Sequence, residues 1–277
     1  MSRLYLRDDI ARAWRGSDPF ERAAGLEGDV YRAVANRRTL RFEIDGRAYF
    51  AKIHRGAGLG EILKNLLTLR LPVVGARNEF LACRHLAAAG VAAPTVAAFG
   101  ERGWNPARRF SFVVCDALEG RESLEDLGAR WSDVPPGGLE RRRLVMAVAR
   151  FARAFHGAGV VHRDFYVCHL LVDRAALAGG RVDLAVIDLH RAQVRQRIPR
   201  RWLLRDLAAL LYSVLDLPLG ERDWLRFVRA YRNRPLPEVM RAEGDFWRDV
   251  RRRADALYRK GARKGLVQGR YRPGSVP

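Results

Sequence analysis

Carboxylate and imidazole side chains gather in two short strings in the second half of the chain. The first string, residues 162–172, reads His-Arg-Asp-Phe-Tyr-Val-Cys-His-Leu-Leu-Val and contains Asp164 and His169. The second string, residues 186–190, reads Val-Ile-Asp-Leu-His and contains Asp188. A carboxylate can accept a proton from an attacking hydroxyl, and carboxylates and imidazoles can bind divalent cations. Phosphoryl transfer uses both kinds of group, so these residue types suggest that chemistry.

The two strings resemble the catalytic loop and the metal-binding segment of the protein-kinase-like fold. The resemblance implies that Asp164 orients or deprotonates the acceptor hydroxyl and that Asp188 holds the Mg²⁺ that bridges the phosphates of ATP. Two departures are visible, because His169 stands where asparagine is usual and Leu189-His190 replace Phe-Gly. Mg²⁺ prefers oxygen ligands, so His169 either joins Asp188 at the metal or braces the loop.

The first half of the chain supplies matching groups for the nucleotide. Lys52 is one of only four lysines among 51 basic residues, and the resemblance implies that it binds the α- and β-phosphates with Glu79 as its ion-pair partner. The glycine-rich loop is degenerate, with the single Gly28 in about the right place to approach the phosphates. Asp206 follows the metal segment, where such folds often place an aspartate that braces the catalytic loop.

Alternation, periodicity and turn residues predict the elements that position these groups. Helices are expected over 76–89, 139–155, 200–215, 222–231 and 243–260, and strands over 39–44, 48–53, 91–99, 109–114, 170–172 and 184–187. These elements make the fold class α+β, and the resemblance implies a two-lobed protein-kinase-like fold with ATP between a β-rich N-lobe (1–117) and a helical C-lobe (118–277). Residues 56–75 form a leucine-rich insertion, and the basic tail after Gly261 is predicted to be mobile.

A finer match carries the resemblance across most of the chain. Residues 52–56, 61–67, 71–79, 162–169 and 187–192 together resemble the lipopolysaccharide core heptose kinases of Gram-negative bacteria. This resemblance implies an ATP- and Mg²⁺-dependent kinase, a transferase that phosphorylates the first heptose of the lipopolysaccharide inner core. It also implies a cytoplasmic location, peripheral at the inner face of the inner membrane. In that family His169 and Leu189-His190 are the normal pattern.

A formal net charge of +20 and an isoelectric point near 11.1 favour polyanionic partners. The lipopolysaccharide acceptor, with its carboxylates and phosphates, and an anionic membrane surface both fit this charge. An acidic protein such as an acyl carrier protein fits it too, and the leucine-rich insertion is a candidate contact for a partner or an acyl chain. Basic and aromatic residues are not interleaved, so no nucleic-acid partner is expected.

Composition excludes several protein classes. The chain is 48% hydrophobic and 30% charged, which is ordinary for a globular protein. Its three cysteines have neither disulfide-framework nor zinc-ligand spacing, and no apolar stretch is long enough to span a membrane. Three alternatives stay open: a kinase-like phosphotransferase for another small-molecule acceptor, a protein kinase, which the lack of an Ala-Pro-Glu segment after Asp188 disfavours, and a basic pseudokinase that binds polyanions without turnover.

Overall fold

The computed structural model describes residues 2–34, 36–56, 75–105 and 108–272. The chain divides into two compact units. Unit 1 comprises residues 1–88, 93–119 and 188–192, and unit 2 comprises residues 89–92, 120–187 and 193–277. The main division falls between Glu119 and Gly120. The segment 188–192 belongs to unit 1, although residues of unit 2 come before and after it in sequence. The predicted insertion 56–75 lies outside the described residues, apart from Gly56 and Gly75.

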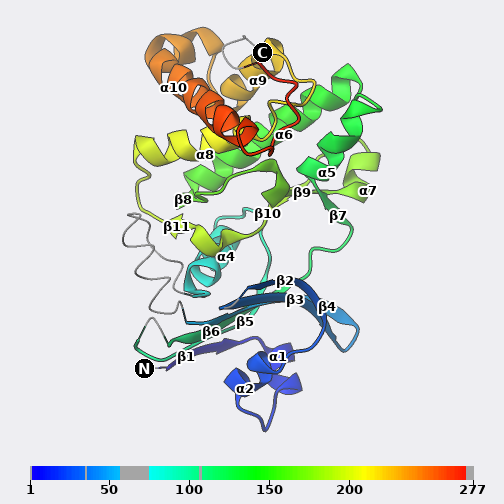
Figure 1. Cartoon of the computed structure of the whole chain (residues 1–277), viewed down its shortest axis with the longest axis vertical. Coiled ribbons are helices and arrows are strands. Elements are labelled where there is room, and N and C mark those ends of the chain that lie inside the picture. The colour runs from blue at the N-terminus through cyan, green and yellow to red at the C-terminus, as the bar shows by residue number, and fades with distance from the viewer. Residues whose placement is uncertain (1, 35, 57–74, 106–107, 273–277) are drawn as a thin grey trace. The chain divides into compact units, whose positions relative to one another are not determined.

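Unit 1 is built on an antiparallel six-stranded sheet with the strand order β1-β5-β6-β4-β3-β2. Figure 1 shows α1 and α2 on one side of this sheet and α4 on the other. The strands are β1 (Ser2–Leu6), β2 (Asp29–Val34), β3 (Arg37–Ile44), β4 (Arg47–Arg55), β5 (Val96–Arg102) and β6 (Phe110–Asp116). The helices are α1 (Asp8–Ala13), α2 (Pro19–Ala24) and α4 (Arg77–Ala88).

The Asp45-Gly46 turn between β3 and β4 sets the register of the hairpin that carries Lys52. Both turn residues have positive φ, 50° and 72°, as the two-residue hairpin turn that matches strand twist requires. The turn places Thr39 opposite Lys52. Ala51 and Ile53 lie in the hydrophobic core shared with α1 and α2, so the alternation of a strand directs Lys52 to the opposite face.

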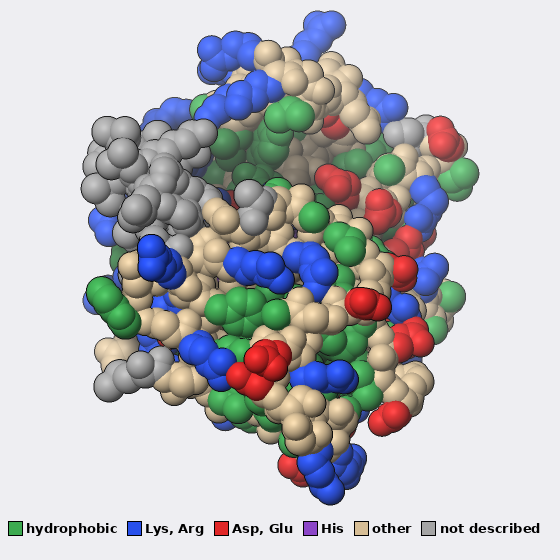
Figure 2. Space-filling model, turned by 60° about the horizontal axis from the view of Figure 1, so that its bottom comes forward, with side chains coloured by type: hydrophobic (Ala, Val, Ile, Leu, Met, Phe, Trp, Pro, Cys, Tyr) green, Lys and Arg blue, Asp and Glu red, His purple; other side chains and the backbone are tan. Residues whose placement is uncertain are grey.

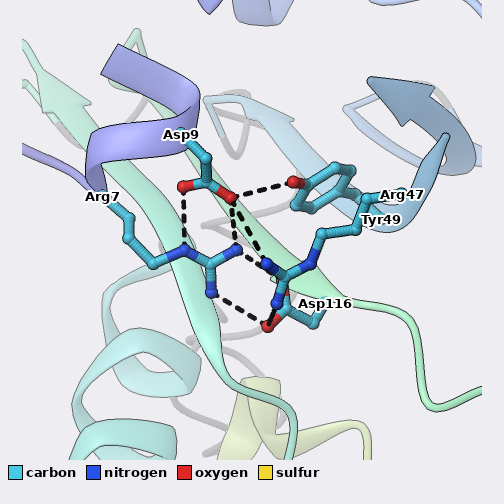
Figure 3. A network of polar contacts seen from close by, with 5 residues as sticks. All are labelled: Arg7, Asp9, Arg47, Tyr49 and Asp116. Carbon is cyan, nitrogen blue, oxygen red and sulfur yellow. Dashed lines mark hydrogen bonds and ion pairs between the residues drawn. The ribbon is translucent and has the colours of Figure 1, made fainter. Parts of the chain in front are cut away.

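An ionic network that the sequence analysis did not predict fastens the N-terminal segment to the end of β6 (Figure 3). The Arg7 guanidinium donates to both carboxylate oxygens of Asp9 and to both of Asp116. Arg47 adds a hydrogen bond to Asp116, and the Tyr49 hydroxyl donates to Asp9. The hydrogen bond from Arg7 outweighs burial and holds the pKa of Asp9 well below its usual range. The network thus ties the start of the chain to β6, the last strand of unit 1's sheet in chain order and an interior strand of that sheet.

Unit 2 is mainly helical, with two small antiparallel sheets, β10-β9-β7 and β11-β8. Its longest helix, α10, bends at Glu243, whose φ of −136° departs from helical geometry. The helices are α5 (Leu124–Ala129), α6 (Gly138–Gly157), α7 (Arg174–Ala178), α8 (Arg200–Tyr212), α9 (Glu221–Arg232) and α10 (Leu236–Ala262). The strands are β7 (Arg121–Ser123), β8 (Val160–Val161), β9 (Leu170–Asp173), β10 (Leu184–Val186) and β11 (Gln193–Val194).

Predicted segments differ from the structure in three main places. The helix expected over 243–260 is the second part of α10, which begins at Leu236 and bends at Glu243. The strand expected over 91–99 begins only at Val96, after Pro94, which has no backbone N–H for a strand ladder. The tail after Gly261, predicted to be mobile, is fastened as far as Tyr271, because the Asp216 carboxylate accepts hydrogen bonds from the backbone N–H groups of Gln268, Arg270 and Tyr271. A single half-buried carboxylate thus holds a basic, glycine-containing segment.

Candidate active site

Lys52, Glu79 and Asp188 meet in unit 1. Lys52 Nζ lies 2.7 Å from Glu79 Oε1 and 2.6 Å from Asp188 Oδ1. Glu79 lies on the first turn of α4, and its side chain is buried. Burial lowers the pKa of Lys52, but the charges of Glu79 and Asp188 more than offset this, so the pKa is raised and the ammonium is kept. The predicted lysine–glutamate pair is therefore present, with Asp188 as a second anion.

The short helical turn η3 (Leu189–Arg191) fixes the direction of the Asp188 side chain. Asp188 has a φ of 60°, a left-handed conformation that aspartate tolerates better than most residues, and the next residue, Leu189, is buried. His190 Nδ1 lies 2.8 Å from Asp188 Oδ1, and since a carboxylate only accepts, the imidazole donates. Burial raises the pKa of Asp188, but the His190 hydrogen bond and the Lys52 charge lower it by more than burial raises it. The pKa of Asp188 therefore lies well below its usual range.

Two more nitrogen-bearing side chains share the sheet face of Lys52. Arg37 on β3 lies opposite His54 on β4, two positions from the Thr39–Lys52 pair, so strand alternation places Arg37, Lys52 and His54 on one face. Arg37 Nη2 lies 3.4 Å from Asp188 Oδ1. Burial, followed by the charges of Arg37 and His190, lowers the pKa of His54 to about 3. His54 is therefore neutral at physiological pH.

The low pKa of His54 predicts an acid-dependent loss of stability. A histidine that titrates lower in the folded than in the unfolded chain contributes fully above the unfolded pKa of about 6.5, and this contribution declines toward pH 3. Between pH 7 and pH 5 the wild type should lose about 2 kcal/mol more unfolding free energy than His54→Gln. Urea unfolding at both pH values measures this difference.

His85→Gln is the matched control, because His85 is exposed on α4 in the same unit. It should keep the pH dependence of the wild type. Equal acid sensitivity in His54→Gln and the wild type would contradict a neutral, buried His54.

The catalytic string in unit 2 is held by Asp206 of α8. The fully buried Asp206 carboxylate accepts hydrogen bonds from the backbone N–H groups of His162 (2.7 Å) and Arg163 (2.9 Å). Arg163 has a φ of 73°, a conformation rare for arginine, and these two hydrogen bonds help to hold it. The bracing role expected for Asp206 matches these contacts.

Imidazole contacts fix the rest of this string. His169 Nδ1 lies 2.7 Å from the backbone oxygen of Asp164, so this nitrogen carries the proton and donates. The His169 ring stacks on His162 at a centroid distance of 5.3 Å. His162 Nε2 in turn donates to the backbone oxygen of Ile187. His169 thus closes the loop around Asp164, which agrees with the loop-bracing alternative for this residue.

Comparison with known proteins decides the family. The sequence matches the lipopolysaccharide kinase (Kdo/WaaP) family over residues 21–231. The chain belongs to this family. Relatives named "Lipopolysaccharide core heptose(I) kinase WaaP" are 50% identical in Pseudomonas aeruginosa, over 95% of this chain and 98% of the relative, and 43% identical in Escherichia coli, over 95% and 100%. This chain of the Kdo/WaaP family is accordingly an enzyme, a kinase.

A solved structure of the same family extends the comparison to the fold. The structure titled "WaaP in complex with acyl carrier protein" is 45% identical to this chain, with a TM-score of 0.80 over 92% of this chain and 99% of its own. Together with the sheet of unit 1 and the helices of unit 2, this match confirms the predicted α+β kinase-like fold.

The donor set of this Kdo/WaaP family member fits a magnesium nucleotide. Mg²⁺ is commonly held by one or two carboxylates together with substrate phosphates, and Asp188 supplies such a carboxylate. Within the described residues no three His, Cys, Asp or Glu side chains form a cluster able to hold a metal, so phosphate oxygens would have to complete the coordination. The Lys52 ammonium would be the cation for those phosphates, and the buried Glu79 Oε2, which has no hydrogen-bond partner among the described residues, is open to a further contact.

The structure gives Gly28 a structural role. Gly28 has a φ of 157°, and a Cβ there would lie 2.1 Å from the backbone oxygen of Arg41. Only glycine allows this close approach of β2 to β3, whatever the ligand. The phosphate contact expected of Gly28 stays a prediction. Arg37, His54 and His190 were not singled out from sequence as site residues. The register of the predicted 39–53 hairpin, continued two positions beyond Thr39 and Lys52, was the signal that could have found Arg37 and His54.

Proposed function

We propose that this kinase transfers the γ-phosphoryl group of ATP to a hydroxyl of the first heptose of the lipopolysaccharide inner core. The observation that carries the proposal is the Lys52–Glu79–Asp188 cluster. It occurs in a chain that is 50% identical, over nearly its whole length, to a relative named for that reaction. The name of a relative does not explain how the reaction occurs. The cluster does, because it has the charges that a magnesium nucleotide needs.

Each residue has a stated part in this reaction. Asp164 accepts the proton of the heptose hydroxyl while the oxygen of that hydroxyl forms a bond to the γ-phosphorus. The bond between the γ-phosphorus and the bridging oxygen breaks, and ADP leaves with that oxygen. Lys52, oriented by Glu79, binds the α- and β-phosphates, and Asp188 would hold Mg²⁺, which when bound would supply positive charge beside the phosphate oxygens.

The backbone contacts of unit 2 support the part assigned to Asp164. Two hydrogen bonds to Asp206 and one from His169 fix the chain on both sides of this residue. A base held in this way needs little reorganisation when the substrate arrives. His169 therefore acts as a positioning residue through the backbone oxygen of Asp164, which is the alternative to metal binding that the contact favours.

The test is ATP-dependent phosphate incorporation into inner-core lipopolysaccharide that lacks phosphate on the first heptose. The native chain should incorporate phosphate with Mg²⁺ present, and chelation of the metal should stop it. Mapping of the product should place the phosphate on the first heptose. ATP binding without incorporation would instead favour a different small-molecule acceptor, and absence of ATP binding would favour a polyanion-binding pseudokinase.

The charge of the chain supports an anionic acceptor and an anionic membrane surface as partners. Figure 2 shows Lys and Arg side chains in several separate places on the face it presents, so they do not mark one docking patch there. Among the described residues no helix is long and apolar enough to cross a membrane. We propose peripheral binding to the cytoplasmic face of the inner membrane, which sedimentation with vesicles containing phosphatidylglycerol would test, since high salt should release the protein.

An acyl carrier protein is a further proposed partner. Two observations support it: the net charge of +20 suits an acidic protein, and the solved relative at 45% identity is titled as a complex with acyl carrier protein. Unit 2 also contains an apolar cavity of about 110 Å³ between α5, α6, α8 and α9, lined by Leu144, Val148, Leu210 and Phe227 among others, whose chemistry suits a hydrocarbon chain. Retention of acylated but not unacylated carrier on the immobilised kinase would support both contacts.

A further inference from the structure

The hairpin between β2 and β3 has no glycine at its tip. Residues 34–37 read Val-Ala-Asn-Arg. A loop that cradles phosphates with its backbone N–H groups relies on glycines for close approach, so this tip is a poor cradle. Arg37, the first residue of β3, offers a side-chain cation at the same end of the hairpin.

Strand register brings Arg37 to the Lys52 cluster. Arg37 is paired with His54 and Thr39 with Lys52, so Arg37 and Lys52 lie on one face at neighbouring cross-strand positions. Side chains at such diagonal positions come within reach of each other when they are long. The contact from Arg37 to Asp188 Oδ1 places the guanidinium beside the same oxygen that Lys52 contacts.

The hydrogen bonding of Arg37 is incomplete. Its bond to Asp188 measures 3.4 Å, compared with 2.6 Å for Lys52 and 2.8 Å for His190 on the same oxygen. Its Nε is buried and has no hydrogen-bond partner among the described residues. Buried donors in folded proteins are normally paired, so a guanidinium held by one long bond is poorly satisfied by protein groups alone. The planar guanidinium fork matches two phosphate oxygens at once.

We propose that Arg37 binds the β- or γ-phosphate of the nucleotide through its guanidinium fork and thereby replaces the missing glycine-rich cradle. The inference rests on the proposed ATP-dependent function and adds a substrate-binding residue to it. Arg37 exchanges its long contact with Asp188 for two charge-assisted hydrogen bonds to phosphate oxygens. Lys52 keeps its contact with Glu79, so the two cations bind the polyphosphate from neighbouring positions on one sheet face.

Nucleotide affinity of Arg37→Ala, measured by calorimetry without acceptor, tests the proposal. ATP, ADP and AMP are each titrated with Mg²⁺ and again with EDTA. Loss of a charged hydrogen-bond partner should weaken ATP binding by roughly tenfold to a hundredfold. AMP binding should stay within about twofold, because AMP has only the α-phosphate. Comparison of the losses for ATP and ADP identifies the phosphate, and Arg37→Lys, which keeps the charge but not the fork, should show an intermediate loss.

Arg41→Ala is the matched control. Arg41 lies on the same strand and face as Arg37, but its ion pairs are with Glu43 and Glu119. It should bind all three nucleotides like the wild type.

Two results would overturn the proposal. Unchanged ATP affinity in Arg37→Ala would show that Arg37 makes no contact with the phosphates. A loss seen only with Mg²⁺ present, and absent in EDTA, would mean that Arg37 acts through Asp188 and does not touch phosphate. Because these measurements use no acceptor, they stand apart from the transfer assay, in which the heptose kinase proposal can fail while the Arg37 proposal holds.

Discussion

Replacement of Asp164 by asparagine is expected to lower the turnover number for phosphate transfer by about 10²- to 10⁴-fold. An amide keeps the shape of the carboxylate but cannot accept the hydroxyl proton. The backbone oxygen of Asp164 and the N–H groups of His162 and Arg163 make hydrogen bonds that this substitution leaves in place. Asparagine also has nearly the same shape as aspartate, so the unfolding free energy should change by less than about 1 kcal/mol. Steady-state transfer to the inner-core acceptor and urea unfolding measure the two effects.

Asp183→Asn is the matched control for this variant. Asp183 is an exposed carboxylate of the same unit, and its partner is Arg121. The control makes the same chemical change without touching the catalytic string, so its turnover should equal that of the wild type. An Asp164→Asn enzyme that kept most of its turnover would rule out Asp164 as the base.

The parts of the site that could be predicted from sequence are those whose position depends on residues close together in the chain. Asp45-Gly46 fixes a tight turn, the turn fixes the strand register, and the register determines the face on which Lys52 lies. Glu79 follows on the first turn of the next described helix. These short-range rules place Lys52 on its sheet face, but the resemblance to the kinase fold, and not the register, implied that Glu79 would be its partner.

The contacts that sequence could not predict join distant segments through details of side-chain direction. Arg37 and Asp188 are separated by 151 positions, and their contact depends on the left-handed backbone of Asp188. The Arg7–Asp116 pair spans 109 positions, and it depends on β1 pairing with β5 at the sheet edge. Asp8 and Asp9 look alike in sequence, and only this packing decides that Asp9 meets Arg7. Arginine is so frequent in this chain that its presence carries little positional information.

Replacement of Asp188 by asparagine is expected to lower phosphate transfer by about 10³-fold or more, because a neutral amide binds Mg²⁺ poorly and removes the charge that positions it. The nucleotide should still bind through Lys52, but addition of Mg²⁺ should no longer strengthen ATP binding. The fold should also lose about 2 kcal/mol of unfolding free energy, since Lys52 and His190 each lose a charged acceptor. Calorimetry with and without Mg²⁺, and urea unfolding, measure these changes.

Asp45→Asn in the hairpin turn is the control, because asparagine suits the positive φ of that position and the change in charge is the same. It should leave transfer and metal dependence unaltered. The pKa of Asp188 lies below its usual range, so the stability difference between Asp188→Asn and the wild type should be complete above about pH 4 and shrink as the pH falls further. If Mg²⁺ strengthened ATP binding equally in both proteins, the metal would have to be held elsewhere, and Asp188 would be left with only the structural role of balancing the charges of Lys52 and Arg37.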